Sequence, residues 1–134
     1  MSGYKYIETT VARFIASRYR FVVEAGAGTN IHAAELIQRA GVHITCIDLF
    51  IPDGIFPVSY VMCDVNNPDY SLFTGVECIY AIRPGEEMIC PLIHIAQRIN
   101  ADFLVYHLGF EGYKHPGKII EKDVGLRQYV TRQN

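Results

Sequence analysis

The sequence predicts an α/β fold of three layers, in which a mostly parallel β-sheet lies between helices and a C-terminal β-hairpin completes the sheet. Short apolar runs rich in β-branched and aromatic residues alternate along the chain with amphipathic stretches of helical length. The first of these runs leads directly into a glycine-rich turn and then into a helical stretch. Because the order strand, crossover helix, strand builds a parallel sheet, both observations favour the α/β class.

Composition limits the classes to which the protein can belong. With 134 residues, of which 50% are hydrophobic and 19% charged, we expect a single domain over residues 1–134. A net charge of −2 and a pI near 6.2 give no field that would gather nucleic acid. The sequence has no basic-then-apolar N-terminal signal and no apolar stretch of about 18 residues, which predicts a soluble, cytoplasmic protein without a membrane partner. The cysteines show no metal-ligand spacing, so we expect no metal and no disulfide: Cys46, Cys63, Cys78 and Cys90.

The first forty residues predict a helix, a strand, a turn and a second helix. Residues 4–19 place apolar side chains at spacings of three and four, with Glu8 on the opposite, polar face. Residues 21–23 are β-branched or aromatic, which is typical of a strand buried on both faces. A turn with two glycines follows, and residues 31–40 carry the apolar stripe of a helix packed on the sheet.

The second and third apolar runs, residues 42–47 and 58–63, predict two more strands. Only residues 49–57 separate Asp48 from the third run, whereas a parallel crossover normally takes a dozen or more residues and a helix. Two alternatives follow. Either the crossover is an irregular extended segment, or the third run is not the strand next to the second. In the second case Asp64, which follows the third run, would not lie near Asp48 at the edge of the sheet.

The second half of the chain continues the pattern. Residues 76–82 predict a central strand, residues 86–99 a helix, and residues 102–108 a further strand. Two short runs at residues 119–121 and 128–130, with a turn between them, predict the closing β-hairpin.

Three carboxylates each close one of the first three apolar runs: Glu24, Asp48 and Asp64. The carboxyl ends of parallel strands share one edge of a sheet, where open α/β sheets bind their ligands. We therefore expect the three acids to share a rim with the turn Gly26-x-Gly28, whose glycines let a ligand approach the backbone. A tight turn without any ligand is the simpler interpretation of the two glycines.

The glycine turn differs from a dinucleotide fingerprint. That fingerprint needs a third glycine at position 31, where this chain has Ile31, so the sequence argues against pyrophosphate binding. Asp48 lies twenty residues beyond Gly28, where a carboxylate can accept both hydroxyls of a ribose.

Arg83 ends the strand predicted over residues 76–82, at the edge where the chemistry of such sheets is found. An arginine offers donors only, so Arg83 is the candidate catalytic residue for holding a carboxylate or phosphate group. Pairing with a neighbouring glutamate, which would order the loop, is an equal alternative. An enzyme that acts on an anionic metabolite through Arg83 with His107 or His115 is a further alternative.

Three pieces of the chain together resemble an archaeal family of short proteins, uncharacterised protein family 0146: residues 23–28, Asp48 and residues 79–84 with the acids that follow. That family is similar to the Rossmann-like S-adenosylmethionine-dependent methyltransferases, of which its members are truncated relatives. The resemblance implies a methyltransferase-type sheet with S-adenosylmethionine as cofactor. In that superfamily the glycine loop faces the amino-acid half of the cofactor, the acid after the second strand binds the ribose, and the acid after the third lies by the adenine. The implied cofactor-binding residues are Glu24, Gly26, Gly28, Asp48 and Asp64.

Two hypotheses about function follow. The first is a truncated methyltransferase-like protein that binds S-adenosylmethionine or S-adenosylhomocysteine, with an acceptor pocket supplied by residues 66–75, residues 109–117 or a second subunit. The second is a non-catalytic α/β protein-interaction module that keeps the fold without turnover and forms a homodimer or binds a protein partner. Four aromatic side chains are candidates for such a surface: Tyr4, Tyr6, Phe110 and Tyr113.

Overall fold

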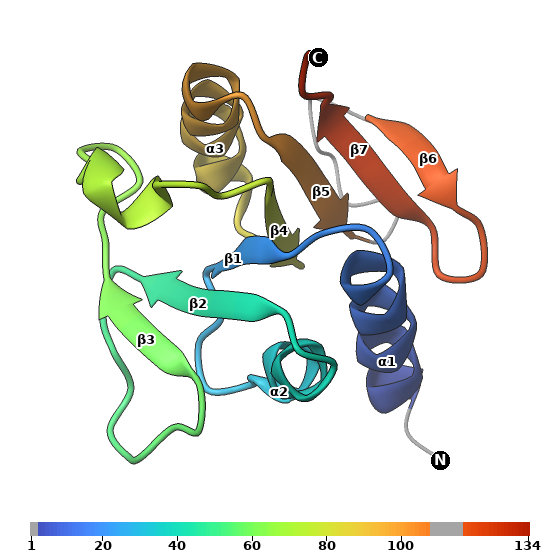
Figure 1. The fold of residues 1–134 in the computed structure, drawn as a ribbon. Helices are drawn as coiled ribbons and strands as arrows, with labels where there is room; N and C mark the ends of the chain where they lie inside the picture. Colours follow the sequence, from blue (N-terminus) through green and yellow to red (C-terminus); the bar gives the residue numbers. More distant parts are fainter. Residues whose placement is uncertain (1–2, 108–116) are drawn as a thin grey trace.

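The computed structural model describes residues 3–107 and 117–134, which form one seven-stranded sheet in the order β3-β2-β1-β4-β5-β7-β6 (Figure 1). The first five strands in chain order are parallel: β1 (Phe21–Ala25), β2 (His43–Asp48), β3 (Ser59–Met62), β4 (Cys78–Ile82) and β5 (Asp102–Tyr106). The C-terminal hairpin of β6 (Lys118–Glu121) and β7 (Leu126–Val130) joins antiparallel to β5. The predicted fold class, including the closing hairpin, is confirmed.

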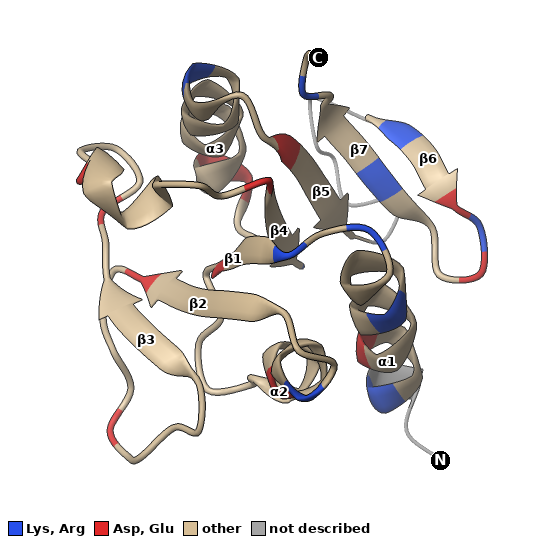
Figure 2. Ribbon diagram, viewed as in Figure 1, with Lys and Arg blue, Asp and Glu red and all other residues tan. Residues whose placement is uncertain are grey.

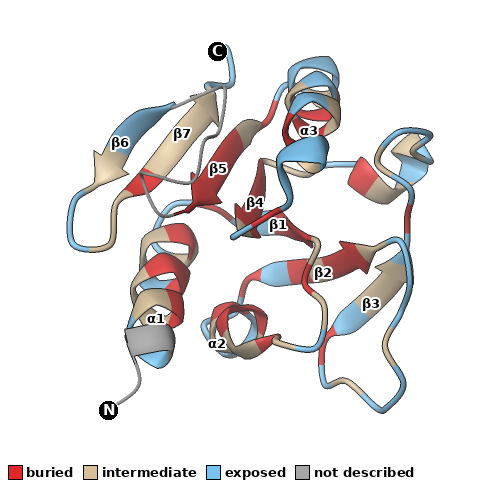
Figure 3. Ribbon diagram, turned by 180° about the vertical axis from the view of Figure 1, so that it is seen from behind, coloured by how far each residue is buried: buried red, intermediate tan, exposed pale blue. Residues whose placement is uncertain are grey.

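Helices cover both faces of the sheet. On one face lie α1 (Gly3–Ala16) and α2 (His32–Arg39), and on the other lie α3 (Glu86–Ile99) and the short 3₁₀ helix η1 (Tyr70–Phe73). Alternation along each strand sends one side chain to each face, so Val22 packs toward α1 and α2 while Val23 packs toward α3. Because both faces are covered, the central strands are mostly apolar and buried, with Glu24 of β1 as a buried exception, and Figure 3 shows them as the buried middle of the molecule.

The crossover from β2 to β3 contains neither helix nor strand. Residues 49–58 form turns and extended backbone, and β3 nevertheless pairs in parallel with β2, with Asp48 opposite Met62. The first of the two alternatives is therefore the observed one, and Asp64 stays at the carboxyl end of the strand beside β2. The predicted loop over residues 109–117 lies outside the described residues except for Gly117.

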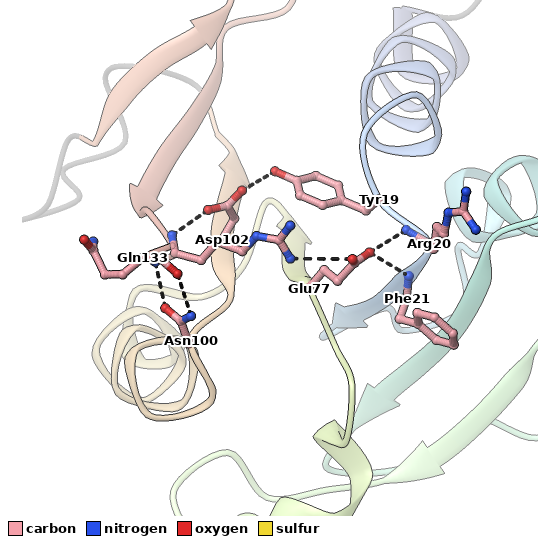
Figure 4. A network of polar contacts seen from close by, with 8 residues as sticks. Tyr19, Arg20, Phe21, Glu77, Asn100, Asp102 and Gln133 are labelled. Atoms are coloured by element: carbon pink, nitrogen blue, oxygen red, sulfur yellow. Dashed lines mark hydrogen bonds and ion pairs between the residues drawn. The ribbon is translucent and has the colours of Figure 1, made fainter.

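A polar network ties the C-terminal tail to the opposite, amino-terminal edge of the parallel strands (Figure 4). Asp102, at the start of β5, accepts hydrogen bonds from the Tyr19 hydroxyl at 2.5 Å and from the Arg132 backbone N–H at 2.7 Å. Glu77, just before β4, accepts from the Arg20 N–H at 2.7 Å and lies 3.6 Å from the Arg132 guanidinium. These contacts anchor the C-terminal tail at the amino-terminal edge of the parallel strands.

None of the described helices is long and apolar enough to cross a membrane; the longest, α1 and α3, have 14 residues each.

Candidate functional site

A cavity of about 220 Å³ lies at the carboxyl ends of β1, β2 and β3, beside the first turn of α3. It is lined by Gly26, residues 47–49, residues 63–66, Glu87 and Met88. The strand order reverses between β1 and β4, since the chain runs outward through β2 and β3 on one side and through β5 on the other. The cavity therefore occupies the place where open α/β sheets bind ligands.

Gly26 is the residue at which the backbone comes closest to the cavity. Its φ is +68°, and its N–H donates to the Ile47 carbonyl at 2.8 Å, which holds the turn after β1 against the end of β2. A Cβ atom at this position would lie 3.1 Å from Cε of Met88 and 3.2 Å from its sulfur. Only glycine satisfies both the left-handed backbone and this close approach.

Asp48 joins the glycine turn to β2. One carboxylate oxygen accepts the Gly28 N–H at 3.0 Å and the other accepts the Leu49 N–H at 2.7 Å. From β3, the Tyr60 hydroxyl donates to the Gly28 carbonyl at 2.9 Å. The predicted proximity of Gly28 and Asp48 is therefore observed. The Gly28 N–H, which a phosphate-binding turn would offer to its ligand, is instead directed at the protein's own carboxylate.

Three acidic side chains line the cavity, and among the described residues that line it there is neither lysine nor arginine. Asp48 closes β2, Asp64 follows β3, and Glu87 lies in the first turn of α3. Asp64 is oriented by the Asn66 N–H, which donates to its carboxylate at 2.9 Å. Such a lining favours a ligand that carries hydrogen-bond donors or positive charge, and disfavours a phosphate group.

Glu24 does not line this cavity. Its neighbours Val23 and Ala25 point toward α3, so Glu24 points to the other face, where the Tyr80 hydroxyl donates to its carboxylate at 2.5 Å. Its exposed fraction is 3%. Burial raises the pKa of Glu24 to about 7, an effect that the hydrogen bond from Tyr80 opposes and the nearby carboxylate of Glu8 reinforces.

The sequence prediction that Glu8 lies on the polar face of the first helix is wrong. Glu8 is 2% exposed, because α1 packs over the glycine turn and not over open solvent. One of its carboxylate oxygens accepts from the Asn30 amide at 2.9 Å, while the other is buried without a hydrogen-bond partner. Asn30 in turn accepts the His32 N–H at 3.2 Å, so Glu8 holds the far end of the turn where α2 begins.

Arg83 and His107 lie at the ends of β4 and β5, and neither lines the cavity. Arg83 has a left-handed φ of +52°, donates its N–H to the Tyr106 carbonyl at 2.7 Å, and places its guanidinium 5.6 Å from the centre of the Tyr106 ring. His107 is 5% exposed, with Nε2 lying 2.8 Å from the Tyr129 hydroxyl. His115 lies outside the described residues.

The structure thus brings together Gly26, Asp48 and Asp64, joins Gly28 to Asp48 by a hydrogen bond, and buries Glu24 below the cavity, in register with Cys46. Sequence reasoning missed Met88 and Glu87, which the first turn of α3 supplies. Their place in the sequence could have indicated them, because they closely follow the strand predicted over residues 76–82, at whose carboxyl end a ligand site is expected. Within residues 66–75, named as one possible source of an acceptor pocket, Asn66 lines the cavity, whereas Phe73 is buried in the core on the α3 side of the sheet.

A family model matches residues 7–132, nearly the whole chain, and its description is uncharacterised protein family UPF0146. The chain belongs to this family. The matching relatives include the UPF0146 protein of Archaeoglobus fulgidus, 30% identical over 99 residues that cover 71% of this chain and 74% of the relative. The UPF0146 protein of Pyrococcus horikoshii is 27% identical over 104 residues, covering 73% of this chain and 79% of the relative. The resemblance predicted from residues 23–28, Asp48 and residues 79–84 is confirmed.

Solved structures with the same fold as this UPF0146 protein are methyltransferases. A putative ribosomal RNA methyltransferase from Plasmodium falciparum superposes with a TM-score of 0.53 at 16% identity, covering 78% of this chain and 76% of that one. A didemethyltoxoflavin N1-methyltransferase from Burkholderia thailandensis, solved with S-adenosylhomocysteine, gives a TM-score of 0.56 at 16% identity, covering 95% of this chain and 61% of that enzyme. At this identity the likeness establishes the fold.

Proposed function

We propose that the acid-lined cavity at the ends of β1, β2 and β3 binds the adenosine part of S-adenosylmethionine or S-adenosylhomocysteine. The observation that carries the proposal is the charge of the lining: three carboxylates, with neither lysine nor arginine among the described residues around the cavity. The adenosine part of both ligands offers ribose hydroxyls and an adenine amino group as hydrogen-bond donors and bears no phosphate, so it matches a lining of carboxylate acceptors. ATP and NAD bring phosphates, and the described residues around the cavity supply no cation to complement them.

Each residue of the site binds a different part of the ligand. Asp48 is held by two backbone N–H groups and keeps lone pairs on both oxygens, so it accepts the ribose hydroxyls. Asp64 accepts from the adenine amino group, while Ile47 and Met88 supply the apolar faces for the ring. Gly26 lets the ligand pass close to the backbone.

The size of the cavity supports this division. Its 220 Å³ is below the roughly 300–1,000 Å³ of a site that encloses a whole drug-sized ligand. The cavity therefore takes the nucleoside, and the amino-acid half of the ligand lies along the open glycine turn. A methyl group carried on that half would face the carboxyl end of β4, where Arg83 lies.

Calorimetric titration of the full chain tests the proposal. We expect heat of binding with S-adenosylmethionine and with S-adenosylhomocysteine, and affinities at least ~10-fold lower for ATP and NAD because of the carboxylate lining. Asp64→Asn should weaken binding of the adenosyl ligands, whereas Asp123→Asn, on the remote hairpin turn, should leave it unchanged. Absence of heat with either adenosyl ligand at millimolar concentration, or equal affinity for ATP, would refute the proposal.

A further inference from the structure

The crossover from β2 to β3 and β3 itself expose an unusual amount of apolar surface. Five large side chains contribute, and we call them the β3 patch: Leu49, Phe50, Ile51, Ile55 and Met62. Ile55 is 99% exposed, Phe50 75% and Met62 64%. The crossover and β3 lie side by side at one end of the sheet (Figures 1 and 3). Exposed apolar side chains gathered in one region of a protein mark an interaction site, whereas isolated ones do not, and these five come from one crossover and the strand that it leads into.

The missing crossover helix explains why the β3 patch is exposed. In a parallel sheet the helix between two strands normally covers their flank. Here residues 49–58 contain no helix; Phe56 of the crossover packs on Tyr60 of β3, but β3 is the end strand, and no further strand of the described residues pairs with its outer edge. Met62, which belongs to β3, is left nearly two-thirds exposed for this reason.

The two end strands of the sheet differ in how they are protected. β6 carries Lys118 and Glu121, and the adjoining turn adds Lys122 and Asp123, so charges guard that edge (Figure 2). All four residues of β3 are uncharged. Charged side chains on an edge strand discourage pairing with another strand, and β3 has none of them.

We infer that the β3 patch is the surface through which two copies of this chain pair about a twofold axis. A second copy offers the unpaired backbone groups of its own β3, which match those of the first in an antiparallel arrangement. The patch suits contact with itself because Asp53 is the only charged residue within residues 49–62. A strongly charged partner would find no complementary charge there.

The size of the β3 patch agrees with a dimer interface. A fully exposed large apolar side chain has a surface of about 150–200 Å². With the exposed fractions of its five side chains, the β3 patch exposes roughly 500–650 Å². A standard interface buries about 800 Å² on each partner. The side chains of the patch supply most of that area, and the backbone edge of β3 and the rest of the crossover complete it.

Sedimentation velocity on the full chain, from micromolar to millimolar concentration, tests the inference. We expect the parent to reach twice its chain mass of 15.1 kDa as concentration rises. Ile55→Asp should raise the dimer dissociation constant at least ~100-fold, because two aspartates would face each other across the axis. Since Ile55 is 99% exposed, this change should leave the circular dichroism spectrum and the monomer fold intact.

Ile119→Asp is the matched control, because Ile119 is an exposed isoleucine on the opposite end strand, β6. It should dimerise like the parent. A parent that stays monomeric up to millimolar concentration would overturn the inference. Unchanged dimerisation of Ile55→Asp, or loss of dimerisation in Ile119→Asp, would overturn it as well. Leu49 belongs to both the β3 patch and the cavity lining, but the substituted Ile55 does not line the cavity, so dimerisation and cofactor binding are measured independently.

Discussion

The two edges of the parallel strands are built in opposite ways. At the amino-terminal edge, the carboxylates of Asp102 and Glu77 bind hydroxyl, backbone N–H and guanidinium groups of the same chain (Figure 4). At the carboxyl edge, acids gather around a cavity and Arg83 takes a left-handed conformation, whereas the left-handed Asn100 at the other edge is held by two hydrogen bonds with Gln133. Satisfied polar groups stabilise a fold, whereas strain and unneutralised charge cost stability and mark functional sites. The comparison indicates a stabilising role for the first edge and supports the proposal that the second binds a ligand.

The largest effect is expected at Gly26. Gly26→Val should abolish binding of S-adenosylmethionine, because a β-branched residue is strained at φ +68° and its Cβ would press on Met88 and into the cavity. Gly41→Val is the control, since Gly41 has φ +90°, has no atom within 4 Å of an added Cβ, and lies at the end of α2. It should lose stability but keep its affinity when titrated in the calorimeter. Undiminished binding by Gly26→Val would place the ligand elsewhere.

Asp102→Ala tests the stabilising role of the amino-terminal edge. It removes the acceptor of the Tyr19 hydroxyl and of the Arg132 N–H, so we expect a loss of about 3 kcal/mol in the free energy of unfolding. Urea denaturation measures the loss. Ligand affinity of the folded protein should not change, and a large fall in affinity would contradict the separation of the two edges.

Glu24→Gln tests the buried acid beneath the carboxyl edge. Since the pKa of Glu24 is raised to about 7 from a usual value near 4.5, the folded state holds its proton more tightly than the unfolded chain. The tighter proton binding adds about 2–3 kcal/mol to the free energy of unfolding. This contribution is fully present below pH 4.5 and is lost as pH rises through 7. Glutamine keeps the acceptor for Tyr80, so melting temperatures of the variant should fall less between pH 5 and pH 8.

Glu35→Gln is the control for this pH dependence. Glu35 forms only a surface pair with Arg39 at 3.6 Å, so the variant should follow the parent at every pH. A parent whose stability did not decline between pH 5 and pH 8 would show that Glu24 has an ordinary pKa in the folded protein.

The smallest effect is expected at Arg83. Arg83→Gly removes the cost of a left-handed arginine before a proline but also loses the guanidinium contact with Tyr106, so we expect the free energy of unfolding to change by less than about 1 kcal/mol. Asn100→Gly provides the comparison, because Asn100 also has a positive φ, of +58°, but exchanges two hydrogen bonds with Gln133 at the opposite edge. That variant should lose stability. If Arg83→Gly were the less stable of the two, backbone strain would not distinguish the carboxyl edge.

Most of the sheet could be predicted because strand signals are local. Residues 21–23 and 76–82 are continuous apolar runs, and such runs form strands wherever helices cover both faces. The helix predicted over residues 86–99 was found with the same bounds. The acids at the ends of β2 and β3 meet at the cavity because parallel strands place their carboxyl ends together.

Contacts between elements distant in sequence could not be predicted in the same way. Glu8 has the spacing of a polar helix face, and only the packing of α1 over the glycine turn buries it against Asn30. Glu24 ends an apolar run like Asp48, yet it lies opposite Cys46, two residues below Asp48 in the register, and is therefore buried beneath the rim of the sheet against Tyr80.

The sequence by itself determined which segments become strands and helices, where the glycine turn lies, and that acids close the strands, because these depend on side-chain periodicity and local backbone preference. The tertiary structure alone decided which acids face the cavity, that Asp48 takes the Gly28 N–H, and that β3 is left uncovered. The physical reason is that a strand has two faces and an edge. Which of them meets a helix, a ligand or solvent is set by the packing of the whole chain.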